Sequence, residues 1–196
     1  MRKFYNILLI ILVIAAIVVG AMIVYKYYNE AKNEKELSSF VDETENNLKS
    51  QDKDVRNKNI YKGYKVVGII EIPKIKIKYP ILEKTTVQSM LVSVTKFWGP
   101  DINEFGNVTI VGHNNFSGTM FGKTKNLENG DIIKLTDLKN NTIEYEVFNK
   151  YSIDPNDVSC IKSVEPKTRE VTLITCTKGH KERLVVKARE KNNNLK

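Results

Sequence analysis

With 196 residues, the chain is long enough for one domain of ordinary size together with accessory segments. Its formal charge is +8, of which the first three residues contribute +2 and residues 26–60 contribute −1, so that +7 remains on residues 61–196. Such a charge suits an anionic neighbourhood or serves solubility alone. A nucleic-acid partner is not expected, because the basic residues do not cluster with aromatic ones.

Residues 1–25 predict a membrane anchor. An apolar run without charge extends from Ile7 to Tyr25, and at 1.5 Å rise per residue it reaches roughly 28 Å, close to the thickness of a bilayer core. A signal peptide has a shorter apolar core that ends at a small-residue cleavage site, whereas this run continues past the small residues Gly20 and Ala21. We therefore expect an uncleaved anchor, with a cleaved signal peptide as the alternative. Arg2 and Lys3 favour a cytoplasmic amino end, which would place the rest of the chain outside the cell.

Residues 26–60 differ in character from the anchor. They are rich in Lys, Glu, Asp and Asn and contain neither Gly nor Pro. Such a segment has too few apolar residues to form a domain, so it predicts a solvated helix or a loose polar stalk. The domain would then occupy residues 61–190, and residues 191–196 are expected to be a frayed, flexible tail.

Short apolar or alternating runs bounded by turn residues recur from Tyr61 onward. Residues 85–94 have the spacing of one short amphipathic helix, with Thr85 or Thr86 as its cap. About eight short strands without βαβ alternation predict an all-β domain, a closed or nearly closed barrel of mostly antiparallel strands with one or two short helices. The expected strands include residues 66–72, 75–79, 107–113, 131–136, 142–151, 171–175 and 184–188, and Pro80 is expected to end the second of these. A helical turn is expected at 120–127 and an irregular segment at 152–170.

Three polar side chains are candidates for one site at a rim of this barrel. The strand Val171–Thr175 ends at Cys176, and the next strand begins after Arg183. A short connection favours antiparallel neighbours, which would bring the thiol and the guanidinium together. A thiol beside a permanent cation has a lowered pKa and is a better nucleophile at neutral pH. His113 ends another expected strand, so an imidazole could complete a Cys-His-Arg site.

The residues around these positions resemble the sortase family. The run Thr172–Cys176 followed by Arg183 is similar to the TLxTC…R signature of that family, and Ile110–Asn114 resembles its strand-end histidine. Gly68–Pro73 resembles the early Gly-x-I/L-x-I-P phrase. The resemblance covers roughly residues 64–190 and implies an eight-stranded sortase-type β-barrel.

Sortases are membrane-anchored cysteine transpeptidases of Gram-positive bacteria. The resemblance implies that Cys176 attacks the Thr–Gly bond of an LPxTG-like sorting signal and forms a thioacyl intermediate. His113 would act as general acid and then as base, Arg183 would bind the substrate backbone and the oxyanion, and Thr175 would line the pocket. The implied partners are proteins with such a signal and an amine of a cell-wall precursor, a lipid-linked peptidoglycan. The implied location is the cell membrane, single-pass with an extracellular catalytic domain, and neither a cofactor nor a metal is expected.

Subtype and metal binding stay open at this point. The chain lacks a lid segment with an Asp-Pro-aromatic anchor and a long helical insertion before the cysteine, so it resembles class D or class A sortases. Residues 152–170 correspond to the loop that usually selects the sorting signal. Asp101, Glu104 and Glu165 could be offered as calcium ligands, but they form no dense acidic cluster in the sequence.

Two further residues have alternative interpretations. His180 could replace His113 as the partner of Cys176, but it lies in a polar turn and is expected to be exposed or to contact substrate. Cys160 could form a disulfide with Cys176, which would consume the nucleophile, so we expect a free thiol without a role. Two other functions remain as alternatives: a membrane-tethered cysteine endopeptidase that uses water as acceptor, and a non-catalytic β-barrel binding module with a structural thiol.

Overall fold

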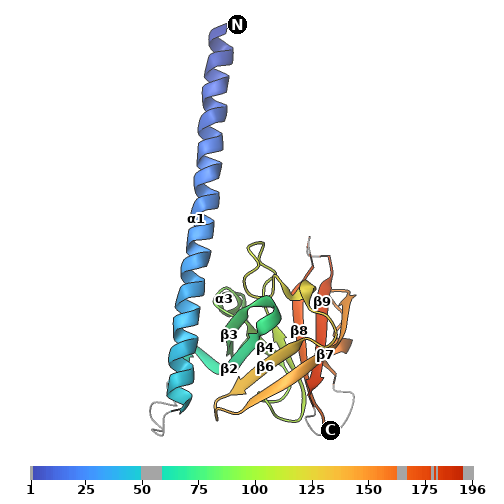
Figure 1. Ribbon diagram of the computed structural model, residues 1–196. Helices are drawn as coiled ribbons and strands as arrows, with labels where there is room; N and C mark the ends of the chain where they lie inside the picture. Colours follow the sequence, from blue (N-terminus) through green and yellow to red (C-terminus); the bar gives the residue numbers. More distant parts are fainter. Residues whose placement is uncertain (1, 50–58, 163–166, 178, 180, 192–196) are drawn as a thin grey trace. The chain divides into compact units, whose positions relative to one another are not determined.

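The computed structural model describes residues 2–49, 59–162, 167–177, 179 and 181–191 (Figure 1). The chain divides into two units between Glu36 and Leu37. The helices are α1 (Arg2–Lys49), η1 (Pro73–Ile75), α3 (Val87–Met90), η2 (Thr124–Asn126) and η3 (Ser159–Ile161). The strands are β1 (Ile60–Tyr61), β2 (Tyr64–Ile72), β3 (Ile77–Leu82), β4 (Thr95–Trp98), β5 (Gly106–Val111), β6 (Ile132–Asp137), β7 (Thr142–Ile153), β8 (Arg169–Cys176) and β9 (Arg183–Glu190).

The first unit is the part of α1 that ends at Glu36. Within the described part of the chain, α1 is the one helix long and apolar enough to cross a membrane. Its large apolar side chains between Ile7 and Tyr25 are all exposed. An apolar helix that is buried by no protein is stable in hydrocarbon, where its backbone groups bond within the helix. This part of α1 is therefore a candidate membrane anchor.

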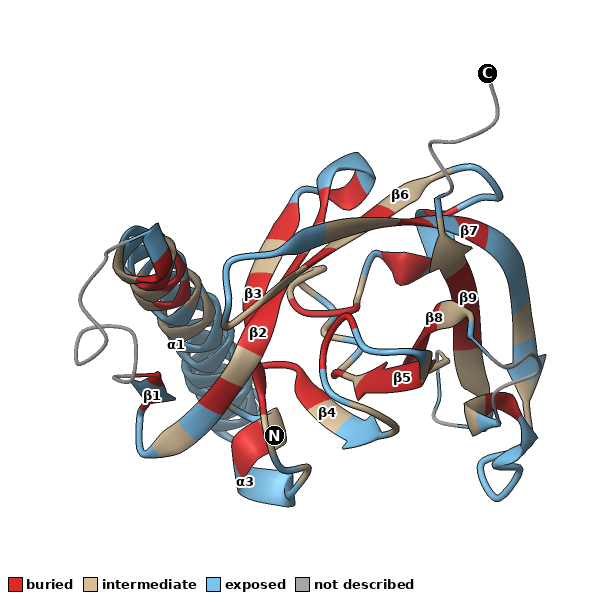
Figure 2. Cartoon of the chain, turned by 90° about the horizontal axis from the view of Figure 1, so that it is seen from below, coloured by how far each residue is buried: buried red, intermediate tan, exposed pale blue. Residues whose placement is uncertain are grey.

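The second unit contains a closed β-barrel. The strand order is β1-β2-β3-β4-β5-β8-β9-β7-β6, and β6 also pairs with β2, so that strands β2 to β9 form a closed eight-stranded barrel as predicted (Figures 1 and 2). Strand β1 adds one short pairing to β2. Two neighbouring pairs, β3–β4 and β5–β8, are parallel, and the others are antiparallel. The second parallel pair matters most, because it aligns two strand ends that carry candidate site residues.

Alternation along the strands fills the barrel with aliphatic side chains. Every second residue of a strand points to the same face, and the inward residues of several strands are fully buried (red in Figure 2). One continuous core results, because these side chains belong to a single cluster of buried contacts. Its members include Ile70, Ile81, Ile110, Leu135 and Leu173.

The structure differs from the sequence prediction between residues 75 and 98. The helix expected at residues 85–94 is the single turn α3, with Thr86 and Ser89 forming a capping box at its start. Strand β4 follows directly and was not predicted. Pro80 lies inside β3, although it was expected to end a strand. Proline is tolerated there because β3 pairs with β4 at one residue pair only, so most of that edge needs no N–H donor.

The last turns of α1 belong to the barrel unit rather than to a solvated stalk. Leu37, Val41, Thr44 and Leu48 recur at helical spacing and are buried. Leu37 joins the barrel core, whereas Val41 and Leu48 pack with Ile69 of β2. The sequence predicted a polar segment here because charged residues separate the members of this stripe. Residues 50–58 of the expected stalk and 192–196 of the expected tail lie outside the described residues.

Candidate active site

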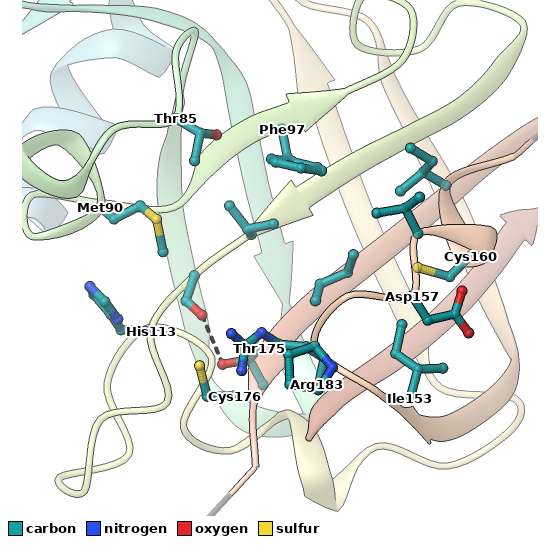
Figure 3. A pocket seen from close by; sticks show the side chains of 16 residues that line it. Thr85, Met90, Phe97, His113, Ile153, Asp157, Cys160, Thr175, Cys176 and Arg183 are labelled. Atoms are coloured by element: carbon teal, nitrogen blue, oxygen red, sulfur yellow. Dashed lines mark hydrogen bonds between the residues drawn. The ribbon is translucent and has the colours of Figure 1, made fainter. Parts of the chain in front are cut away.

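Strands β5, β8 and β9 bring the three candidate site residues together. In the parallel pair β5–β8, Val111 lies opposite Ile174, so that His113 and Cys176 each follow two residues beyond this pair. In the antiparallel pair β8–β9, Cys176 lies opposite Arg183, as the short connection predicted. Because β8 lies between β5 and β9, the thiol has the imidazole on one side and the guanidinium on the other (Figure 3).

Hydrogen bonds continue between β5 and β8 beyond the paired residues. The Gly112 N–H donates to the Ile174 carbonyl at 3.2 Å. The Thr175 hydroxyl donates to the Gly112 carbonyl at 2.8 Å (Figure 3), and the Asn114 amide donates to the Cys176 carbonyl at 2.7 Å. Backbone movement at either strand end would break one of these bonds. They therefore hold the histidine and the cysteine segments in a fixed register.

Packing explains why a glycine precedes the histidine. A Cβ atom on Gly112 would lie 2.9 Å from Phe121 Cδ2 and 2.9 Å from Val94 Cγ1. Both of these side chains are buried and cannot move aside freely. The Gly-His sequence thus reflects a backbone that passes close to the core just before His113.

The connection between β8 and β9 fixes the cysteine against the arginine. The Thr177 N–H donates to the Glu182 carbonyl at 3.0 Å, and the Glu182 N–H donates to the Thr177 hydroxyl at 3.2 Å. These bonds close the hairpin one pair beyond Cys176 and Arg183. His180, considered as an alternative partner of the thiol, lies outside the described residues.

A cavity of about 250 Å³ opens beside the three residues, and His113, Thr175, Cys176 and Arg183 all line it (Figure 3). The rest of its wall is mostly apolar and comes from two sides of the barrel. One side is formed by the segment around α3 and β4, and the other by the segment between β7 and β8. The apolar lining residues are Met90, Phe97, Val111, Ile153, Pro155, Val158, Ile161 and Ile174.

Arg183 has an unused hydrogen-bond donor at this cavity. Its side chain is half-buried, and its Nη1 atom is buried without a hydrogen-bond partner among the described residues. A buried donor without an acceptor costs about 1–3 kcal/mol. A substrate carbonyl or a developing oxyanion in the cavity would supply the missing acceptor.

The two cysteines are both free thiols in different environments. Cys176 is half-buried at the cavity. Cys160 in η3 is buried and also lines the cavity, which the sequence did not indicate. Burial raises the pKa of the Cys160 thiol, while the nearby Lys187 lowers it to a smaller extent. The disulfide that was weighed as an alternative is not formed.

The acidic residues that were weighed as calcium ligands have other partners. Asp101 pairs with Lys96 at 2.8 Å and Glu104 with Lys139 at 3.9 Å, both on the surface. Glu165 lies outside the described residues. Across the described ranges, no three His, Cys, Asp or Glu side chains lie close enough together to hold a metal ion.

Comparison with known proteins identifies the family of the barrel domain. The Sortase domain family matches residues 70–191. Sortase A of Listeria monocytogenes is 33% identical over 114 residues, which are 58% of this chain and 50% of that protein. The match thus spans about half the length of this curated relative.

Two solved structures from Clostridium perfringens extend the comparison. A Sortase D5 transpeptidase superposes with a TM-score of 0.67 and 25% identity, over 82% of this chain and 99% of that chain. A sortase C solved with the C-terminal cell wall sorting motif has a TM-score of 0.59 and 25% identity, over 85% and 97% of the two chains. The family match covers more than half of the chain and includes all three strand-end residues, so the chain belongs to the sortase family of cysteine transpeptidases.

Proposed function

We propose that this chain is a sortase transpeptidase that cleaves an LPxTG-like sorting signal between Thr and Gly and transfers the acyl group to an amine of a cell-wall precursor. The observation that carries this proposal is the position of Cys176 between His113 and Arg183 on adjacent strand ends, at a cavity with apolar walls. A nucleophile beside a base and beside an unused donor is the arrangement that acyl transfer needs.

In the first half of the reaction, the Cys176 thiolate attacks the carbonyl carbon of the substrate threonine. The carbonyl oxygen takes on negative charge, and Nη1 of Arg183, which has no partner among the described residues, would donate a hydrogen bond to it. The C–N bond to glycine then breaks, and the imidazolium of His113 gives its proton to the leaving amine. The product is a thioester on Cys176 and a released glycine peptide.

In the second half, an amine of the cell-wall precursor attacks the thioester carbonyl. His113 takes the proton of the attacking amine, the C–S bond breaks, and the thiolate is regenerated. An amide bond then joins the substrate protein to the precursor. Water in place of the amine would give hydrolysis, which is the chemistry of the endopeptidase alternative.

The cavity walls suit the apolar part of a sorting signal. The lining between β7 and β8 and around β4 is aliphatic and aromatic, which favours burial of leucine and proline side chains. The sortase C relative was solved with a sorting motif, and this supports a substrate of the same kind here. The positive charge on residues 61–196 would assist an approach to an anionic lipid-linked precursor.

The apolar part of α1 supports a location at the cell membrane. We infer that it anchors the chain as a single span with the amino end in the cytoplasm, because Arg2 and Lys3 precede the apolar run. The barrel would then lie outside the cell, where cell-wall precursors and surface proteins meet.

Peptide cleavage by the full chain in detergent tests the proposal. A fluorogenic LPxTG-like peptide should be cleaved by the wild-type chain and by Cys160→Ala, but not by Cys176→Ala. Addition of triglycine or of a diaminopimelate mimic should convert the hydrolysed product into a ligated one.

Three results would change the assignment. Cleavage that no amine redirects would favour the endopeptidase. Loss of cleavage in Cys160→Ala alone would mean that the wrong thiol is assigned. If no peptide in a broad panel of sorting peptides is cleaved and Cys176 is inert to alkylation, the non-catalytic binding module becomes the favoured function.

A further inference from the structure

A buried polar cluster lies behind one wall of the cavity, and the proposed mechanism does not use it. It consists of Asn107 on β5, Thr172 on β8 and Lys187 on β9, which are exposed by 2%, 0% and 7%. We call these three residues the carbonyl clamp. They lie on the same three neighbouring strands that carry His113, Cys176 and Arg183 at their ends.

The carbonyl clamp and the candidate site share one face of the sheet. Along β8, Thr172 precedes Cys176 by four residues, and along β9, Lys187 follows Arg183 by four. Residues separated by an even number point to the same side of a strand. Thr172 also lies opposite Lys187, as Cys176 lies opposite Arg183. The clamp residues therefore lie on the sheet face that carries Cys176, four residues away along β8 and β9.

The clamp donors converge on the backbone of η3. The Asn107 amide donates to the Cys160 carbonyl at 3.1 Å and to the Ile161 carbonyl at 3.0 Å. The ammonium of Lys187 donates to the Cys160 carbonyl at 3.2 Å. Thr172 orients the amide, because its hydroxyl donates to Asn107 Oδ1 at 2.8 Å.

The charge of Lys187 is balanced by a buried carboxylate. Its Nζ atom lies 3.6 Å from Glu170 Oε2, which is an ion-pair distance rather than a hydrogen bond. The Glu170 side chain is fully buried and also accepts from Arg189 at 2.8 Å. A buried lysine is costly to desolvate, and here the Glu170 carboxylate and the η3 carbonyl both offset that cost.

The segment that the clamp holds is a wall of the cavity. Asp157, Val158, Cys160 and Ile161 all line it (Figure 3). Segments between strands move more than the strands themselves, and this one includes residues 154–158, which are not part of a helix or strand. The distance between this segment and Cys176 therefore depends on the hydrogen bonds that hold the segment against β5, β8 and β9.

We propose that the carbonyl clamp positions this wall relative to Cys176 and thereby sets the affinity and selectivity for the apolar part of the substrate. This inference rests on the proposed function. Asn107 and Lys187 are positioning residues, because they act through the backbone of η3 and do not line the cavity. Their loss should weaken substrate binding and leave the chemistry at Cys176 in place.

Kinetics of Asn107→Ala and Lys187→Met test this proposal in the full chain. Asn107→Ala removes two hydrogen bonds to carbonyls and Lys187→Met removes a charge-assisted one. KM for the sorting peptide should therefore rise about tenfold while kcat stays within about twofold. The ratio of kcat/KM for a leucine peptide to that for its alanine analogue should fall as well. Lys150→Met is the matched control: Lys150 also donates to two carbonyls, at 2.8 and 2.6 Å, but these anchor η2, which does not line the cavity.

A second measurement needs no turnover. In a Cys176→Ala background, Cys160 is the remaining thiol, and it reports directly on release of η3. Asn107→Ala should raise its alkylation rate about tenfold, because exposure of a buried thiol accelerates the reaction, whereas Lys150→Met should not. Asn107→Ala is used here because Lys187 lowers the pKa of Cys160, so that its removal would also change the fraction of thiolate.

The outcomes separate this proposal from the proposed function. If KM is unchanged in Asn107→Ala and Lys187→Met, or if kcat falls with KM unchanged, the clamp does not position the wall. The same conclusion follows if Cys160 stays unreactive in a folded Asn107→Ala chain. If the wild type cleaves no peptide, the proposed function fails, and the alkylation rate still decides whether the clamp holds η3. Should Asn107→Ala not fold, Lys187→Met provides the test. A raised KM together with faster hydrogen exchange of the Ile161 and Lys162 amides would support the clamp, and the absence of both would contradict it.

Discussion

Arg183→Met tests whether the guanidinium of Arg183 serves the proposed reaction or the stability of the fold. Methionine keeps much of the apolar length of arginine and removes the guanidinium. In the substrate-free protein, Nη1 of Arg183 is buried without a partner among the described residues. An unsatisfied buried donor lowers stability, and in the proposed mechanism a bound oxyanion or carbonyl would supply the missing acceptor.

The two roles predict effects of different size on kcat and on stability. Removal of one oxyanion donor lowers kcat by about 10²–10³. Removal of an unsatisfied buried donor costs no stability and can add up to about 1–3 kcal/mol to the free energy of unfolding. For a domain of about this size, Tm moves by about 2–4 °C per kcal/mol. We expect kcat to fall at least a hundredfold while Tm stays the same or rises.

Arg189→Met provides the matched control on the same strand. Arg189 makes two hydrogen bonds to the buried Glu170, at 3.2 and 2.8 Å, so its loss removes a partner from a buried carboxylate and should lower Tm. Peptide kinetics and thermal unfolding of the two variants are the assay. If Arg183→Met loses as much Tm as Arg189→Met, or keeps its kcat, the oxyanion role of Arg183 is wrong.

Three further predictions concern the fold, the second thiol and the strand end. Leu37→Ala should lower the free energy of unfolding by about 2–5 kcal/mol in chemical denaturation, since a 2%-exposed core side chain is removed, whereas Ser38→Ala at the exposed neighbouring position should not. An equal effect of both variants would show that Leu37 does not stabilise the barrel. Burial raises the pKa of Cys160 above its ordinary value near 9, so the folded chain keeps a proton that the unfolded chain loses, and stability should fall as pH rises above about 9. Urea titrations of Cys160→Ala should lack this part of the pH dependence. Gly112→Ala should lower Tm and kcat together, because the new Cβ meets buried carbon atoms at 2.9 Å; unchanged kinetics would show that the strand end tolerates the displacement.

The candidate site could be predicted from the sequence because its chemistry lies at the ends of strands. Cys176 and Arg183 flank a short polar connection, and hairpin pairing of their strands follows from local pattern alone. The pair Gly112-His113 marks the end of another strand. The parallel pairing of β5 with β8 completes the site, and only the family resemblance, not periodicity, indicated that these two strands would be neighbours.

Elements that depend on long-range contacts were not predicted. Strand β4 and the strand position of Pro80 depend on which edges of β3 need donors. The buried stripe on α1 consists of one residue in every three or four, so its composition is that of a polar segment. In each case the sequence contains the residues, but a neighbouring element determines whether they are buried.

The sequence by itself determined the apolar amino-terminal helix, the all-β domain, and the identity of the thiol, imidazole and guanidinium at strand ends, because period and polarity are local properties of the chain. Tertiary structure alone decided that Nη1 of Arg183 has no hydrogen-bond partner among the described residues and that Lys187 reaches the carbonyl of Cys160, 27 residues away. A hydrogen bond between distant residues depends on the path of the backbone between them, and no local pattern of residues specifies that path.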